Sequence, residues 1–375
     1  MKLQMPLLLL VLAISGVYAL GGRNHVRKKR CVVLISAVMG LFSGLRSWWM
    51  GDLIKYYTLY RRCVGPEWTE AILENAANTG IRWFFRLAGW MGISYDNCLL
   101  IIAVFVAVTL GVLIYRYSPS PFWSYLMYIA MGFYLFTYSG LKQTIAMGFL
   151  TLAVMAMFED KPGKFLLWVV VGSLFHAPAL IFLAAWPFCR QKINSRYFLV
   201  LVGVFVGMFL FRTQIGGILS ELYYDEQDTF VLMDTFEVGG RFWMMLLIMA
   251  LGVFLRPLHN WDRVYVQVFN LMVIAAALQT MSVFDHNFTR LADYYYQFIV
   301  LFIPMMMELG GSRARKMPEH RHEIQYYDPN IYVLLSIGIL AFGLWYYNGF
   351  ISSSWAILQD FVFRWEIDPY ALYGS

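Results

Sequence analysis

Long apolar runs separated by short polar segments restrict the fold of this chain more than any other feature. A helix needs about 20 apolar residues to cross a bilayer core, so each run is interpreted as one crossing. The runs lie near residues 3–20, 31–46, 97–115, 121–138, 141–158, 197–212, 241–256, 263–283, 295–310 and 329–349. Only 14% of the residues are charged, too few to cover a water-soluble protein of this length. The sequence predicts an all-α, polytopic integral membrane bundle of about 10 full transmembrane helices.

One further apolar stretch, residues 165–188, carries His176 and Pro178 at its middle. Proline removes a helical hydrogen bond and clashes with the preceding turn, so a break is favoured there. Basic loops favour the cytoplasmic side of a membrane. The basic clusters lie at 23–30, 190–196, 256–263 and 313–321. They share one side only if the chain turns back near His176, so the sequence predicts a broken or re-entrant helix pair.

The predicted break determines which segments lie outside the membrane. The basic cluster follows the first apolar run, so this run is expected to be a retained helix with its N-terminus outside. Residues of about 47–96 alternate charged and aromatic side chains, which is typical of one or two amphipathic helices in the interface. The absence of repeats and linkers predicts a single membrane domain over 1–375, with an extracytoplasmic amphipathic segment at about 47–96.

Charge and cysteine patterns exclude two other classes. The net charge of +6 comes from short clusters between apolar runs, as in topology-setting loops, so no nucleic-acid partner is expected. The four cysteines have no paired spacing, which indicates neither a disulfide framework nor a zinc site.

Several ionisable residues lie at the predicted outer ends of helices, where charge is costly unless it is paired or solvated. They are Arg46, Asp52, Lys142 with its neighbour Gln143, His176, Arg290 and Asp293. Three cations from separate helices suit a diphosphate, because Arg binds phosphate through a planar fork and Lys as a point charge. A carboxylate beside them is positioned to deprotonate an acceptor hydroxyl.

Each residue also has a purely structural interpretation. Arg46, Lys142 and Arg290 also fit interface anchors, and Asp52 fits a helix cap. Arg290 and Asp293 are three residues apart and could pair with each other. His176 also fits a hydrogen-bonded packing residue. The tyrosines and tryptophans near the outer face suit sugar stacking or an aromatic belt.

Four segments of the chain resemble the EpsG family of Wzy-like bacterial exopolysaccharide polymerases. They are Gly44-Leu45-Arg46 with Gly51-Asp52 and Tyr56-Tyr57; Gly140 to Ala146; Ser173 to Leu180; and Thr289 to Tyr295. The family pattern usually has Arg where this chain has Lys142, so the charge is retained without the planar fork. The resemblance implies a fold akin to membrane-embedded, GT-C-like glycosyltransferases. It also implies polymerisation of undecaprenyl-diphosphate-linked saccharides on the outer face of the bacterial cytoplasmic membrane.

This resemblance gives each candidate residue a role. Arg46, Lys142, Gln143 and Arg290 are expected to bind the donor diphosphate, with Asp52 as first choice for the base and His176 or Asp293 as second. No cofactor or metal is required, although Asp52 and Asp293 leave a metal as an alternative. The expected partners are the lipid-linked saccharide, the bilayer, and a chain-length regulator and flippase of the same pathway. The rival interpretations are a transporter or flippase for the same lipid, an acyltransferase using His176, and a structural subunit.

Overall fold

The computed structural model describes most of the chain. It covers residues 25–49, 52–73, 78–211, 239–255, 262–283, 288–312, 329–353 and 362–366, with parts of 10–14 and 213–218. Most of the predicted run at 3–20 and all of the basic cluster at 313–321 lie outside the described residues.

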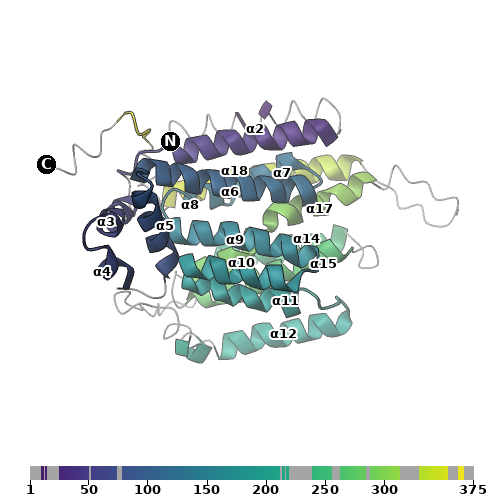
Figure 1. The fold of residues 1–375 in the computed structure, drawn as a ribbon. Helices are drawn as coiled ribbons and strands as arrows, with labels where there is room; N and C mark the ends of the chain where they lie inside the picture. Colours follow the sequence, from purple (N-terminus) through teal and green to yellow (C-terminus); the bar gives the residue numbers. More distant parts are fainter. Residues whose placement is uncertain are drawn as a thin grey trace.

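The described residues form helices, with one isolated β-bridge between Arg46 and Phe363. The long elements are α2 (His25–Gly44), α6 (Tyr95–Tyr117), α9 (Leu141–Phe158), α12 (Ser195–Leu210), α14 (Gly240–Leu255), α15 (Arg263–Gln279), α17 (Ile299–Ser312) and α18 (Pro329–Ser353). Three stretches are long and apolar enough to cross a membrane, namely Tyr95–Tyr117, Leu141–Phe158 and Arg263–Ser282. Several shorter apolar helices accompany them. The helices lie side by side in one bundle (Figure 1), and the described residues confirm the predicted all-helical fold, with three segments of membrane-spanning length and apolarity.

The apolar stretch around His176 turns back on itself, as predicted. Helix α10 (Pro162–Phe175) ends there, and η2 (Ala177–Ala184) and α11 (Ala185–Phe188) follow. His176 itself is extended, with φ −148° and ψ 102°. Asp160, just before α10, forms an ion pair with Arg190, just after α11. Both ends of the stretch therefore lie at one end of the bundle, and His176 lies at the other.

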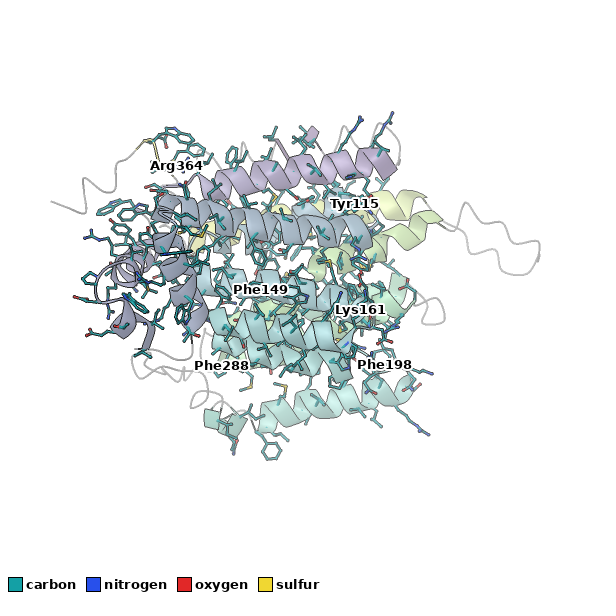
Figure 2. All side chains as sticks on the ribbon, in the orientation of Figure 1. Tyr115, Phe149, Lys161, Phe198, Phe288 and Arg364 are labelled. Atoms are coloured by element: carbon teal, nitrogen blue, oxygen red, sulfur yellow. The ribbon has the colours of Figure 1, made fainter. Side chains whose placement is uncertain are left out.

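Members of three predicted cytoplasmic clusters lie at the end of the bundle that carries Asp160. Arg263 lies 3.2 Å from the Asp160 carboxylate, in addition to Arg190. Lys28 donates a 2.6 Å hydrogen bond to the Ser118 carbonyl, close after α6. Figure 2 shows Tyr115, Lys161 and Phe198 toward this end, and Phe288 and Arg364 toward the opposite one. We call the two ends the Asp160 end and the His176 end.

This topology predicts the labelling of introduced cysteines. Because the Asp160 end gathers the basic loops, Lys192→Cys should resist a membrane-impermeant maleimide in intact cells and react after permeabilisation. Thr58→Cys on α3 (Leu53–Val64), at the other end, should react in intact cells. Both positions are exposed, and the four native cysteines are buried, so background labelling should be low. Labelling of Lys192→Cys from outside would overturn the orientation.

Three short helices lie across the His176 end (Figure 1). They are α3, α4 (Trp68–Leu73) and α5 (Thr79–Trp90), where the sequence predicted one or two. Pro66 explains the additional break, since proline cannot continue a helix. A Cβ on Gly80 would lie 2.8 Å from the Leu174 carbonyl oxygen, so glycine lets α5 touch the last turn of α10. The amphipathic segment is therefore packed next to His176.

Two predicted crossings are interrupted. The run at 121–138 divides into α7 (Pro121–Ala130) and α8 (Phe133–Phe136). Gly132 between them has φ 82°, a left-handed conformation that suits glycine. The run at 295–310 begins as α17, preceded by the separate helix α16 (Phe288–Tyr296). Interrupted helices leave backbone carbonyl and amide groups that need hydrogen-bond partners within a membrane. One of them, the Thr137 carbonyl after α8, accepts a hydrogen bond from Arg46.

Candidate functional site

His176 is the meeting point of three elements at its end of the bundle. Its Nδ1 is hydrogen-bonded to the hydroxyl group of Tyr294 on α16. The positive charges of Lys142, in the first turn of α9, and of Arg290, on α16, both act on its ring. The structure therefore brings Lys142, His176 and Arg290 together, although they come from separate apolar segments.

Tyr56 extends this group to the amphipathic segment. Burial raises the pKa of Tyr56 to about 12. A hydrogen bond to the Lys142 backbone and the positive charge of Arg290 oppose this rise, whereas the negative charge of Asp52 adds to it. At neutral pH the phenol is therefore protonated and is a hydrogen-bond donor, not a base. The group comprises Asp52, Tyr56, Lys142, His176, Arg290 and Tyr294, and we call it the His176 cluster. Tyr56 and Tyr294 are members that the sequence analysis did not assign to the site.

Arg290 and Asp52 are the accessible charges of the cluster. The Arg290 side chain is exposed and has no ion-pair or hydrogen-bond partner within the described part of the chain. Asp52 occupies the N-cap position of α3, but its side chain makes no capping hydrogen bond. Its carboxylate is 52% exposed and lies 3.4 Å from Lys55, which is 84% exposed. Such a surface pair is weak, so the carboxylate can still accept a proton from a substrate.

Gln143 forms a hydrogen bond with the backbone of a cluster residue, Arg290. Its side chain is buried, and its Nε2 donates a 2.8 Å hydrogen bond to the carbonyl of Arg290. The contact joins α9 to α16 and fixes the position from which the Arg290 side chain projects. The structure thus places Gln143 behind Arg290, on the side away from solvent.

Asp293 pairs with a residue that the sequence analysis did not select. The suggested pair with Arg290 is wrong, because the Asp293 carboxylate is in an ion pair with Arg241 on α14. Arg241 opens an apolar run at the His176 end, the same signal that identified Arg46 and Lys142. Its position in the sequence was therefore informative, but its partner depends on tertiary packing.

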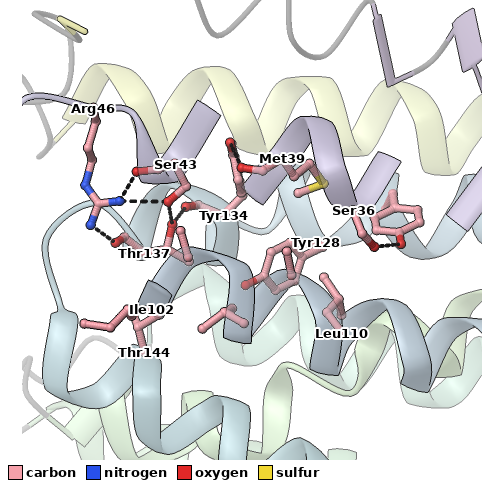
Figure 3. A pocket seen from close by; sticks show the side chains of 14 residues that line it. Ser36, Met39, Ser43, Arg46, Ile102, Leu110, Tyr128, Tyr134, Thr137 and Thr144 are labelled. Atoms are coloured by element: carbon pink, nitrogen blue, oxygen red, sulfur yellow. Dashed lines mark hydrogen bonds between the residues drawn. The ribbon is translucent and has the colours of Figure 1, made fainter. Parts of the chain in front are cut away.

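Arg46 lies buried and apart from the accessible charges. Its guanidinium donates to the carbonyl and hydroxyl oxygens of Ser43 and, at 3.0 Å, to the Thr137 carbonyl (Figure 3). The Tyr138 ring centre is 5.4 Å away. These contacts connect the end of α2 to the turn after α8, where the interrupted helix leaves the Thr137 carbonyl in need of a donor.

The cavity beside Arg46 is too small for a saccharide. It lies between α2, α6, α7 and α9, and both hydroxyl and apolar groups line it (Figure 3). It leaves ≈ 20 Å³ for the centre of a water molecule, about the room that one ordered water needs. Tyr95 connects this region to the cluster, because it lies near both Arg46 and Tyr56. Arg46 is thus next to the His176 cluster but does not share its exposed face.

The cluster combines the groups that phosphate chemistry requires. Lys142 and Arg290 supply positive charge for anionic oxygens, and Tyr56 supplies a hydrogen-bond donor. Asp52 supplies an accessible carboxylate on the neighbouring helix α3. This arrangement can bind a diphosphate beside a proton acceptor.

Comparison with known protein families identifies the family of this chain. The sequence model of a protein family described as the EpsG family matches residues 29–318. The matched region contains every residue of the His176 cluster as well as Arg46, Gln143, Arg241 and Asp293. No curated protein and no solved structure matches the chain.

Proposed function

The chain belongs to the EpsG family, and from this premise we propose that it is a polysaccharide polymerase, a glycosyltransferase that joins polyprenyl-diphosphate-linked saccharide repeat units. Family membership implies a Wzy-like role in polysaccharide synthesis. The observation that supports the specific reaction is the convergence of Lys142 and Arg290 at His176, next to the accessible carboxylate of Asp52.

In the proposed reaction, a hydroxyl oxygen of the acceptor saccharide attacks the anomeric carbon of the donor. The bond from that carbon to the phosphate oxygen breaks, and the polyprenyl diphosphate leaves with the bonding electrons. Lys142 and Arg290 stabilise the charge that develops on the leaving oxygen. Asp52 accepts the acceptor proton. His176 is the second choice for this base, and Arg46 supports the cluster from inside the bundle.

The proposed setting follows from the same reasoning. The protein would be one domain with about 10 crossings and a re-entrant pair, akin to GT-C-like enzymes. It would work in the bacterial cytoplasmic membrane, with the His176 end outside. A flippase that delivers the lipid-linked saccharide and a regulator of chain length are its proposed partners.

Asp52→Asn tests the assignment of the base. The substitution keeps the shape of the side chain and removes its ability to take a proton, so kcat for glycan extension should fall by about 10²–10⁴-fold. KM should change little, because the diphosphate contacts remain. The measurement is the length of lipid-linked glycan made by purified protein in liposomes.

Lys55→Gln is the matched control for this experiment. It removes the ion-pair partner of Asp52 without changing the carboxylate, so extension should continue near the parental rate. Extension by Asp52→Asn at the parental rate would exclude Asp52 as the base.

A lipid-linked-saccharide flippase is the second candidate, and the helix break at His176 favours it. Interrupted helices commonly form the substrate sites of transporters. The two functions differ in product: a flippase moves the lipid-linked saccharide across liposomes without lengthening it. Movement of a fluorescent lipid-linked saccharide with no longer glycan formed would support the flippase and contradict the polymerase.

A further inference from the structure

An ion pair next to the His176 cluster joins α14 to α16. Arg241 and Asp293 are each 15% exposed, and the Arg241 guanidinium lies 4.8 Å from the centre of the Tyr296 ring. Two charges removed from water in this way depend on each other, because losing one partner leaves the other uncompensated. The pair is therefore a fixed part of the fold that the proposed reaction does not use directly.

Asp293 lies where it could interfere with phosphate binding. It follows Arg290 by three residues on α16, and side chains three apart are neighbours on a helix surface. A carboxylate freed at this position would reach the Arg290 guanidinium and neutralise it. In the structure Asp293 faces Arg241 instead, and Arg290 has no side-chain partner within the described residues.

Helix α16 is also held from other sides. Gln143 donates to the Arg290 carbonyl at 2.8 Å, and Tyr294 is hydrogen-bonded to His176. The Tyr295 hydroxyl donates to the Ile181 carbonyl at 2.5 Å. Loss of the Arg241 charge would therefore leave the α16 backbone in place and change mainly the partner of Asp293.

We propose that Arg241 is a positioning residue that holds Asp293 away from Arg290, so that Arg290 remains free to bind a lipid-linked diphosphate. The identity of this ligand rests on the proposed function. In this arrangement Asp293 is not the base, since its carboxylate is engaged by Arg241. The affinity of the cluster for diphosphate thus depends on a residue that does not touch the ligand.

The test compares one single and one double variant. Arg241→Gln should raise KM for the lipid-linked saccharide by about tenfold, because the freed Asp293 neutralises Arg290. Arg241→Gln combined with Asp293→Asn removes both charges and should return KM to within about threefold of the parent. kcat should stay near the parental value in the double variant. An Arg241→Lys variant, which retains the charge, should be closer to the parent than Arg241→Gln.

A binding measurement separates this inference from the proposed function. Purified protein in detergent is titrated with undecaprenyl diphosphate, and the rise in melting temperature reports binding. Weaker binding by Arg241→Gln that returns in the double variant supports the inference, even if no variant extends glycan. The matched control is Arg116→Gln with and without Glu159→Gln, a 2.6 Å pair at the Asp160 end, which should not affect binding.

Two results would overturn the inference. One is a double variant that binds undecaprenyl diphosphate no better than Arg241→Gln. The other is an Asp293→Asn variant that binds normally but no longer extends glycan, which would identify Asp293 as the base.

Discussion

Replacing Arg290 with alanine should slow glycan extension by about 10²–10³-fold, the range expected when one donor to a developing negative charge is lost. The Arg290 side chain is exposed and has no side-chain partner among the described residues, so the fold should tolerate its removal. The measurement is the initial rate of chain extension by purified protein in liposomes, with melting temperature recorded in parallel.

Two variants put this result in context. Arg290→Lys keeps the charge but loses the planar fork, so its rate should lie between those of the parent and Arg290→Ala. Lys164→Ala removes an exposed cation at the other end of α10 and should extend glycan like the parent. If Arg290→Ala extends glycan as fast as the parent, the diphosphate is not bound at the His176 cluster.

Arg46→Ala should instead act first on stability. The substitution removes the hydrogen bonds to Ser43 and Thr137 and leaves a buried carbonyl without its donor. Hydrogen bonds to charged groups contribute about 1.5–3 kcal/mol each, so the free energy of unfolding should fall by roughly 2–4 kcal/mol. The measurement is the melting temperature in detergent, together with the yield of folded protein.

Arg86→Ala is a suitable comparison for Arg46→Ala. Arg86 lies on α5 over the Trp68 ring at 4.5 Å and is only partly buried, so its loss should lower the unfolding free energy by less than about 1 kcal/mol. If the Arg46→Ala protein melts like the parent but does not extend glycan, the result supports the phosphate-binding role that the sequence predicted for Arg46.

The course of the backbone was largely predictable because it follows from apolar length and charge. The turn at His176 could be inferred because Pro178 and the basic loops independently favoured the same break. The interruption at Gly132 was missed, since a single glycine in an apolar run does not show whether it adopts a left-handed conformation. The extra helix in the amphipathic segment was missed for a related reason, because the stop at Pro66 was not weighed.

The sequence analysis selected Asp52, Lys142, His176 and Arg290, which the structure brings together, but it did not predict their contacts. Arg46, Lys142 and Arg290 share the same sequence signal, a cation at the predicted outer end of an apolar run. The structure nevertheless buries Arg46 and exposes Arg290. Likewise, Asp293 had two candidate ion-pair partners, Arg290 nearby in sequence and Arg241 far away. In the structure it pairs with Arg241. Such choices depend on how helices are placed in three dimensions, which a single sequence does not specify.

The β-bridge between Arg46 and Phe363 has a consequence for biogenesis. The Ser47 amide donates to the Val362 carbonyl, and the Arg364 amide donates to the Leu45 carbonyl. A ribosome makes residues 45–47 before nearly all the crossings and residues 362–364 after the last described one. During insertion, the backbone hydrogen bonds between residues 45–47 and 362–364 therefore cannot form until almost the whole chain has been made. Nascent chains released before Val362 would contain every residue of the His176 cluster but lack these closing backbone hydrogen bonds.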